Sequence, residues 1–438
     1  MKKILISVVI LFHLMSCAQV NVTTQVSEGQ AKKWRSDLVK MHNELKERHV
    51  DIYHTVSEES LDSAVNLLYE DIPQLSTSQI LVRIAQIVAM IGDGHTSFYP
   101  SWQKKKEFHV YPIKFWSFSD GIYVTSTTED YKEFLGKKLM GIDRTPIDEV
   151  FDKISTIVGA DNDMEYVYSV PFGIPWAELL YVLGIADSHE KAEFHFENGS
   201  TTLLPLTFKK WRNAEYITAN TMYPNGKSPS QRVEALFATP LIVDSLKFKK
   251  RPRYYWYKHL EEENAIFFQY NVCWDQKDRP SFATMMDNMF RELEETNTER
   301  LIIDLRQNTG GEPMIAQPLI DALKERKAYV DEGRVFVLVS RRTFSAALTN
   351  AVHLRKVGAR TVGEAPRGKP NNPSEGRDID LKSTKIWLTV STQFVERDPD
   401  LGDQDYLPID IKYDMPFDDF RNARDGAFHK AMKAELFN

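Results

Sequence analysis

Ser345 is the residue whose position could support nucleophilic chemistry. It follows a buried-strand pattern at residues 335–339 (VFVLV) and a short polar turn, and it opens a helical stretch at residues 345–355. A hydroxyl at a helix start lies at the positive end of the helix dipole, where free N–H groups stabilise a developing oxyanion. The commoner role of a serine or threonine at such a place is to cap the helix, and Ser345 or Thr343 could do so. These residues alone leave both roles open.

A glycine pair ends the loop after a second buried strand. Residues 301–305 (LIIDL) run into RQNTGG, which closes with Gly310 and Gly311. Strands that alternate with helices predict a parallel or mixed α/β sheet, whose ligands gather beyond the carboxyl ends of the strands. Glycine permits close backbone approach, so this loop could add an N–H donor to an oxyanion site beside Ser345. We expect the oxyanion donors among Gly310, Gly311 and Ala346.

His95 is the histidine that the sequence places best for proton transfer. It stands in a glycine turn, GDGHT, directly after an amphipathic helical pattern at residues 80–91, where an imidazole can be exposed and aimed. The other histidines, of 11 in all, follow no metal pattern, with neither an HExxH motif nor paired cysteines and histidines. We expect neither a metal site nor a cofactor.

The order of these motifs resembles the tail-specific (C-terminal processing) serine protease family. The resemblance rests on DLRQNTGG, on VLVSRRTFSAA around Ser345, on TVGEAPRGKPN after it and on the GDGHT turn. A further segment, LGKKLMGIDRTPIDEV at residues 135–150, is similar to the PDZ-like domain of that family. The resemblance covers residues 30–415 and is weakest at residues 160–260.

The resemblance implies three parts after a signal peptide. These are an N-terminal helical region at residues 18–100, a PDZ-like and β-rich segment at residues 101–255, and a catalytic core at residues 256–438. The core would be an α/β fold of the ClpP/crotonase-like type, with a mixed sheet and flanking helices. The implied activity is hydrolysis of peptide bonds in a peptide or protein substrate, by a serine nucleophile and through an acyl-enzyme.

The family uses two catalytic arrangements, and the sequence carries pieces of both. Processing proteases proper use a Ser–Lys dyad, which Lys369 in a Gly-Lys pair would supply 24 residues after Ser345. The glutamine that usually follows this pair is Pro370 here. The tricorn-like branch uses a histidine ahead of the PDZ-like segment. His95 matches that histidine by context, although Gly94 replaces the serine found before it in tricorn itself.

The acidic member of the tricorn-like arrangement would be Asp403, which precedes the closing segment YLPID. Competing carboxylates are Asp405, Glu375 and Asp398. We favour His95 over Lys369 as the base, because an imidazole with a pKa of about 6.5 is neutral at pH 7 without burial. An ammonium with a pKa of about 10.4 needs a shift of several units, and Lys369 lies in a hydrated, loop-like setting. A His95 base would give kcat/KM an apparent pKa of about 6 to 7.

A non-catalytic, peptide-binding relative is the alternative of a different class. Arg341-Arg342 before the candidate nucleophile and the missing T-x-G-G pattern at residues 365–368 depart from the family. Such a protein would keep a PDZ-like groove and a degenerate active site.

The N-terminus has the features of a bacterial lipoprotein signal peptide at residues 1–17. Two lysines precede an apolar run at residues 4–12 that is too short to span a bilayer, and LMSC at residues 14–17 resembles a lipobox. We expect cleavage before Cys17, lipidation of its thiol, and a membrane-anchored protein of the bacterial cell envelope that faces the periplasm or is exported. We expect Cys273, the second of two cysteines, to be a buried structural thiol.

Composition narrows the class of protein further. With 42% hydrophobic and 27% charged residues the chain is globular, which excludes disordered, collagen-like and coiled-coil proteins. The 55 Lys and Arg against 62 Asp and Glu give a net charge of −7, which argues against nucleic acid as a partner. Neither the oligomeric state nor the individual substrate follows from the sequence.

Overall fold

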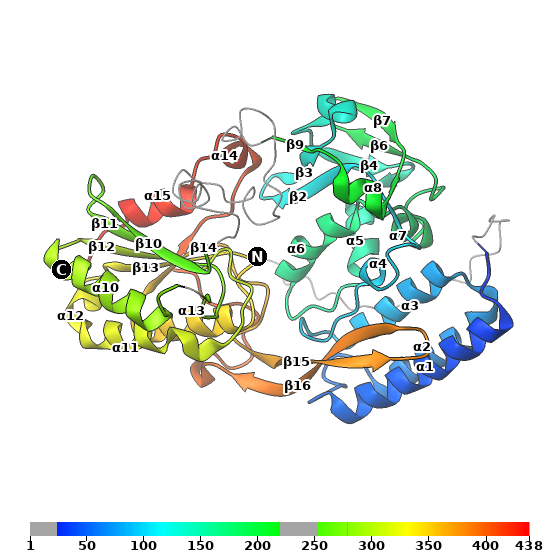
Figure 1. The fold of residues 1–438 in the computed structure, drawn as a ribbon, viewed down its shortest axis with the longest axis horizontal. Helices are drawn as coiled ribbons and strands as arrows, with labels where there is room; N and C mark the ends of the chain where they lie inside the picture. The colour runs from blue at the N-terminus through cyan, green and yellow to red at the C-terminus, as the bar shows by residue number, and fades with distance from the viewer. Residues whose placement is uncertain (1–23, 220–252, 278, 438) are drawn as a thin grey trace, which may run out of the picture.

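The computed structural model describes residues 24–219, 253–277 and 279–437 (Figure 1). The first part of the chain is helical, with α1 (Glu28–Arg48), α2 (Glu58–Asp71), η1 (Ile72–Gln74), α3 (Thr77–Ala89) and α4 (Pro100–Gln103). Ser27, Ser57 and Ser76 cap the three long helices, because each hydroxyl accepts the N–H three residues on. The apolar residues of α3 are buried in the core of this part, so its predicted amphipathic pattern is confirmed.

Two small sheets and several helices form the middle part. One sheet joins β2 (Ile113–Phe118), β3 (Gly121–Thr127) and β9 (Ile217–Thr218). The other joins, in spatial order, β5 (Thr145–Pro146), β4 (Leu139–Ile142), β6 (Ala192–Phe196) and β7 (Gly199–Leu203). Around them lie β1 (His109–Val110), β8 (Leu206–Thr207), η2 (Glu129–Phe134), α5 (Ile147–Ser155), α6 (Asp163–Gly173), α7 (Ala177–Val182) and α8 (Phe208–Asn213). β2 and β3 pair as an antiparallel hairpin, and α5 begins at Ile147, directly after β5.

The C-terminal part is built on a six-stranded mixed sheet of order β10-β11-β12-β13-β14-β17. Its strands are Tyr255–Leu260, Ala265–Tyr270, Arg300–Asp304, Val335–Val339, Arg360–Gly363 and Ile411–Lys412. Only the β10–β11 pair is antiparallel, and the other neighbours are parallel. The predicted mixed α/β sheet is therefore confirmed.

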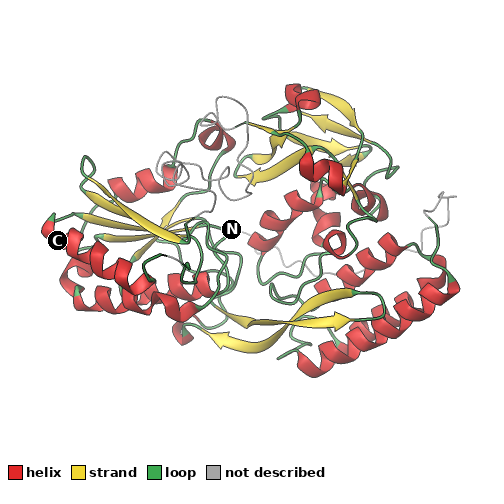
Figure 2. Ribbon diagram, in the orientation of Figure 1, coloured by secondary structure: helices red, strands yellow, loops and turns green. Residues whose placement is uncertain are grey.

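Helices cover both faces of this sheet, as Figure 2 shows. On one face lie α10 (Phe282–Glu295), α11 (Gln317–Glu325), α12 (Lys327–Asp331) and α13 (Ala346–Lys356), and on the other lies α15 (Gly426–Lys433). Successive residues of each strand point to opposite faces of the sheet. Ile303 and Val337 pack on the side of α10 to α13, and Ile302 and Phe336 pack against α15. Because both faces are buried, the strands are continuously apolar.

A long hairpin, β15 (Asn371–Leu381) and β16 (Ile386–Glu396), reaches from this core to the N-terminal helices (Figure 1). Lys40 and Arg48 of α1 donate to the backbone oxygens of Asp380 and Asp378 on β15. The chain then continues through η4 (Pro399–Leu401) and α14 (Phe417–Arg421). The hairpin also contacts the turn after α3 that holds His95, because Ser391 on β16 donates to Asp93 and Ser97 forms a bridge with Thr389.

Candidate active site

Ser345 lies between β13 and α13 in a backbone conformation that serine seldom adopts. Its φ is 53° and its ψ is −127°, and its side chain makes no capping hydrogen bond. The hydroxyl of Thr343 instead donates to the backbone oxygen of Leu305, so neither residue caps α13 through its side chain. The capping interpretation is wrong for both. A non-glycine residue held at positive φ is strained, and such strain clusters at functional sites.

The glycine turn lies directly against Ser345. A Cβ on Gly310 would stand 2.8 Å from the Cβ of Ser345, and Gly310 and Gly311 have φ values of 115° and 135°. Only glycine suits this approach and this conformation. The N–H of Gly310 donates to Oδ1 of buried Asn308 at 2.9 Å, so this amide is engaged and Gly310 acts as a spacer instead of a donor.

Two amides remain to hold an oxyanion. Among the hydrogen bonds of the described residues, the N–H groups of Gly311 and Ala346 have no acceptor. Cys273 fixes the turn through its main chain, because its N–H donates to Gly310 and its carbonyl accepts from Glu312. Its side chain is fully buried, and burial raises the pKa of the thiol to about 11. A structural role for Cys273 is thus consistent with its surroundings.

Asp93 shapes the turn that carries His95. Its Oδ1 accepts from the amides of His95 and Thr96, at 2.9 and 2.7 Å, and from the hydroxyl of Ser391 on β16. Its Oδ2 lies 2.8 Å from Nε2 of buried His49. Burial alone would raise the pKa of the Asp93 carboxyl, but these hydrogen bonds together lower it. The carboxylate therefore ties the His95 turn to β16 and α1.

The ring of His95 stacks on Phe344, the residue before Ser345, with the ring centroids 4.4 Å apart. Both ring nitrogens are buried, and neither has a hydrogen-bond partner among the described residues. The expectation of an exposed imidazole is therefore corrected: Phe344 covers the ring. Burial is the main reason that the pKa of His95 is lowered to about 4; the charge of Asp93 opposes this effect, and the charges of Arg397 and Arg367 add to it. His95 is neutral at pH 7, the state that a general base requires.

Asp161, which sequence reasoning missed, lies on the other side of this turn. Its Oδ2 accepts from Nδ2 of Asn372 at 2.8 Å, and burial raises the pKa of its carboxyl to about 7. A Cβ on Gly94 would stand 2.9 Å from that Oδ2 and 3.2 Å from the ring of Phe344. A serine at position 94, as in tricorn, would need its neighbours to shift. Asp161 comes from a loop far from both motifs, so no local pattern marks it.

Lys369 stands in a different environment from His95. Its Nζ lies 2.9 Å from Asp405 and 3.3 Å from Asp403. Burial lowers the pKa of Lys369, but the hydrogen bonds and charges of these two carboxylates outweigh it and leave the pKa raised. Lys369 is protonated at pH 7, so it is not poised as a base.

The four carboxylates considered as partners of His95 lie in other contacts. Asp403 is 93% exposed and pairs with Lys369, as Asp405 does. Asp398 pairs with Lys356, and Glu375 lies 3.9 Å from Arg377. None of the four hydrogen-bonds to His95 among the described residues. Asp403 as the acidic partner stays a prediction, and this arrangement does not bring it to the imidazole.

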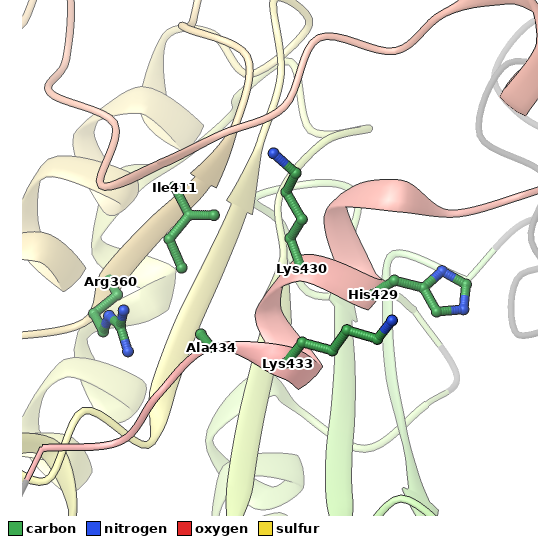
Figure 3. A pocket seen from close by; sticks show the side chains of 6 residues that line it. All are labelled: Arg360, Ile411, His429, Lys430, Lys433 and Ala434. Atoms are coloured by element: carbon green, nitrogen blue, oxygen red, sulfur yellow. The ribbon is translucent and has the colours of Figure 1, made fainter.

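A pocket of about 340 Å³ lies elsewhere on the core, lined by Arg360, Ile411, His429, Lys430, Lys433 and Ala434 (Figure 3). Arg360 begins β14 and Ile411 begins β17, so the pocket is at the amino ends of the parallel strands. Ser345 follows the carboxyl end of β13, at the opposite edge of the sheet. In Figure 3 the side chain of His429 points away from Arg360, so the basic groups do not converge. The pocket is separate from the candidate active site.

Comparison with solved structures addresses the fold. Structures of mature CPAF, and of mature CPAF complexed with lactacystin, match 92% of this chain and 97% and 98% of theirs, with TM-scores of 0.58 and 0.59 and identities of 12% and 13%. The chain has the fold of CPAF. The photosystem II D1 C-terminal processing protease also matches, over 92% of this chain and 99% of its own, with a TM-score of 0.39 and 12% identity. No protein-family model and no curated protein match the sequence.

At identities of 12% and 13%, this likeness concerns the fold alone. The resemblance that the motifs predicted is therefore confirmed at the level of the fold, as a mixed α/β architecture of sheets and helices. The match runs across nearly the whole length of both chains, so it includes the N-terminal helices and the middle part as well as the core.

Proposed function

We propose that this chain is a serine peptidase of the tail-specific family, with Ser345 as the nucleophile. The observation that carries the proposal is the uncapped Ser345, held at a φ of 53° against the glycine turn and at the start of α13. A serine that contributes no cap and yet occupies a strained conformation is explained by a role in chemistry. The Ser345 hydroxyl would attack the carbonyl carbon of a peptide bond.

In this mechanism the neutral His95 takes the proton of the Ser345 hydroxyl as the C–O bond forms. The N–H groups of Gly311 and Ala346 donate to the oxyanion of the tetrahedral intermediate. His95 then gives its proton to the leaving amine, and water hydrolyses the acyl-enzyme by the same steps in reverse order. Because the ring nitrogens of His95 have no partner among the described residues, one of them is free to turn toward the hydroxyl when substrate binds.

The Ser–Lys dyad is the weaker alternative, because Lys369 is held protonated by two carboxylates. A non-catalytic peptide-binding relative is favoured by one observation: no hydrogen bond joins Ser345 to His95 among the described residues. The double arginine before Ser345 does not favour it. Arg341 makes a buried, two-point contact with Glu364 and donates to Ser117, so its role is structural.

A fluorophosphonate probe tests the proposal directly, because it reacts only with an activated serine. We expect the purified protein to be labelled at Ser345, and the label to be found on the peptide that contains this residue. Lactacystin, which CPAF binds, serves as a second probe. A protein that neither compound labels, but that binds peptides, would establish the non-catalytic alternative.

We also propose the location in the cell envelope that the N-terminal segment predicts. Cys17 lies outside the described residues, and within those residues the structure has no helix long and apolar enough to cross a bilayer. A lipid on Cys17 would then be the membrane attachment, with more than one acyl chain needed for a firm anchor. We expect Cys17→Ser to move the protein from the membrane fraction to the soluble or unprocessed fraction. Wild-type protein found mainly in the soluble fraction would contradict this proposal.

A further inference from the structure

Four side chains form a column that ends on His95. The guanidinium carbon of Arg367 lies 3.9 Å from the ring centroid of Tyr168 on α6 and 4.5 Å from that of Phe344. The Phe344 ring stacks in turn on His95, at 4.4 Å and with 22° between the ring planes. Two planar groups cannot share one face of a ring at these distances, so Phe344 lies between Arg367 and His95.

The column is buried and its charge is paired. Glu165, also on α6, places Oε2 3.2 Å from Nε of Arg367, and the two side chains are 5% and 11% exposed. A buried guanidinium is costly unless it is paired, and aromatic faces are its natural neighbours. Three anchors, Glu165, Tyr168 and Phe344, therefore hold Arg367 in one place.

His95 itself has no such anchor, because its ring nitrogens have no hydrogen-bond partner among the described residues. The orientation of its ring is set by its backbone turn and by packing. Among aromatic rings, Phe344 is the one that stacks on it, and Phe344 is held by Arg367. The catalytic histidine is thus supported through an aromatic stack, where a carboxylate would be expected.

We propose that Arg367 and Phe344 are positioning residues for His95. Phe344 sets the plane of the imidazole next to Ser345, and Arg367 holds Phe344 from the other side and keeps a positive charge near the base. This inference rests on the proposed function, because it assigns His95 the role of the base.

The charge of Arg367 acts on His95 alongside three other groups. Arg397, which is buried and bonded to Asn372, disfavours the imidazolium in the same direction. Asp93 favours it, and Asp161 lies against the neighbouring Gly94. Removal of the Arg367 charge leaves the other three in place, so it should make His95 easier to protonate.

Three variants separate the stack from the charge. Phe344→Leu removes the ring but keeps Arg367. Arg367→Lys keeps a charge but loses the planar stack, and Arg367→Gln loses both. Arg326→Gln is the matched control, since Arg326 also lies 4.6 Å from an aromatic centroid, that of Phe290, and pairs with Glu294, but on helices away from the site. Circular dichroism and thermal melting check that each variant is folded.

The first measurement is the rate of fluorophosphonate labelling and kcat/KM as functions of pH. We expect Phe344→Leu and Arg367→Lys to lower both rates about 10- to 100-fold, because a small misplacement of a catalytic group costs that much. We expect Arg367→Gln to lower the rates and also to move the acid limb to higher pH. Arg326→Gln should change neither. The proposal would be overturned if the wild type and all three site variants had the same rates and the same pH at the midpoint of the acid limb.

The second measurement keeps this proposal apart from the proposed function. Proton NMR of the His95 ring gives its pKa whether or not the protein hydrolyses peptides. An upward shift in Arg367→Gln but not in Arg367→Lys supports the charge effect, and an unchanged His95 titration in both overturns it. A wild-type protein that the probe does not label would instead disprove the proposed function, and the His95 titration would still report on Arg367.

Discussion

His95 and Lys369 are the two candidate bases, and the chain places them in opposite surroundings. The imidazole is stacked on Phe344, and its buried nitrogens have no hydrogen-bond partner in the part of the chain that the structure describes, whereas the ammonium is held by Asp403 and Asp405 at the rim of the core. Burial without a partner disfavours the charged form, so the pKa of His95 falls to about 4. Pairing with carboxylates favours the charged form, so the pKa of Lys369 rises.

The difference shows that the setting of a base matters as much as its type. A lysine can serve as a base only where the protein removes its proton at pH 7, and two adjacent carboxylates do the reverse. A histidine needs no such shift of its pKa, and burial lowers the pKa of His95 further than is needed to keep the ring neutral at pH 7. The cost of a low pKa is a weaker base, which the free amides of Gly311 and Ala346 and the placement of Ser345 must offset.

The largest effect is expected for Ser345→Ala, which should lower kcat for peptide hydrolysis by about 10⁴-fold or more, because it removes the nucleophile. Stability should change by less than about 1 kcal/mol, since the hydroxyl caps nothing. Ser281→Ala is the matched control: Ser281 caps α10, so its loss should cost about 1 kcal/mol of stability and leave kcat unchanged. If Ser345→Ala hydrolysed peptides at the wild-type rate, Ser345 would not be the nucleophile.

His95→Ala is expected to lower kcat by about 10³-fold or more, with the fold intact, because no other described group is placed to accept the proton. His49→Ala provides the contrast. His49 is buried against Asp93 and touches the turn but not Phe344, so its loss should act mainly on stability. Steady-state kinetics and thermal melting of both variants check that His95→Ala loses activity and that His49→Ala loses stability. A His95→Ala enzyme that keeps its activity would show that the base lies elsewhere.

Much of this site could be predicted from sequence, because its chemistry lies in local patterns. The strand-turn-helix around Ser345, the glycine turn at residues 310–311 and the GDGHT turn are short segments whose residue types fix their geometry. The partners of these segments could not be predicted. Asp161 reaches the site only through tertiary packing, and nothing in its own neighbourhood distinguishes it from an ordinary loop residue. Asn308 and Arg367 lie within the motifs DLRQNTGG and TVGEAPRGKPN, but the motifs do not reveal that Asn308 accepts from Gly310 or that Arg367 packs on Phe344.

Asp403 shows that a sequence motif can also suggest a residue that the fold does not place at the site. Its position before YLPID matched a family pattern, yet its side chain is almost fully exposed and contacts Lys369. Among the described residues it makes no hydrogen bond to the imidazole, which no local signal reveals. Ser391 on the β15–β16 hairpin donates to Asp93 of the GDGHT turn, a contact across almost three hundred residues.

The pH dependence sharpens the comparison further. The sequence predicts an apparent pKa of about 6 to 7 for kcat/KM, whereas the burial of His95 lowers its pKa to about 4. We therefore expect kcat/KM to stay constant from pH 7 down to about pH 5 and to fall below that, where the imidazole becomes protonated. If kcat/KM of the wild type instead began to fall near pH 6.5, substrate binding or a movement of the protein would expose the His95 ring.

Stability should follow the same titration. Between about pH 6.5 and pH 4 the unfolded chain binds a proton at His95 that the folded chain does not, so stability falls as the pH is lowered through this window. Asp161 acts in the opposite sense, because its raised pKa, about 7, means that its contribution is lost as the pH rises. Comparison of urea midpoints for the wild type and His95→Gln removes the Asp161 effect, and the wild type should lose more stability on acidification.

The smallest effect is expected for Lys369→Ala. This residue forms an ion pair at the rim of the core, with an Asp403 side chain that is 93% exposed, and such pairs contribute about 0 to 1 kcal/mol. We expect kcat/KM to change by less than about threefold and its pH profile to keep its shape, because His95 and not Lys369 sets the limb. Asp403→Asn is the matched control, and it should behave in the same way if Asp403 has no contact with the base. A Lys369→Ala enzyme as inactive as Ser345→Ala, beside an active His95→Ala enzyme, would reverse the choice of base while Ser345 kept its role. Loss of activity in Asp403→Asn alone would instead mean that its loop moves onto His95 during turnover, and would restore Asp403 as the acidic partner.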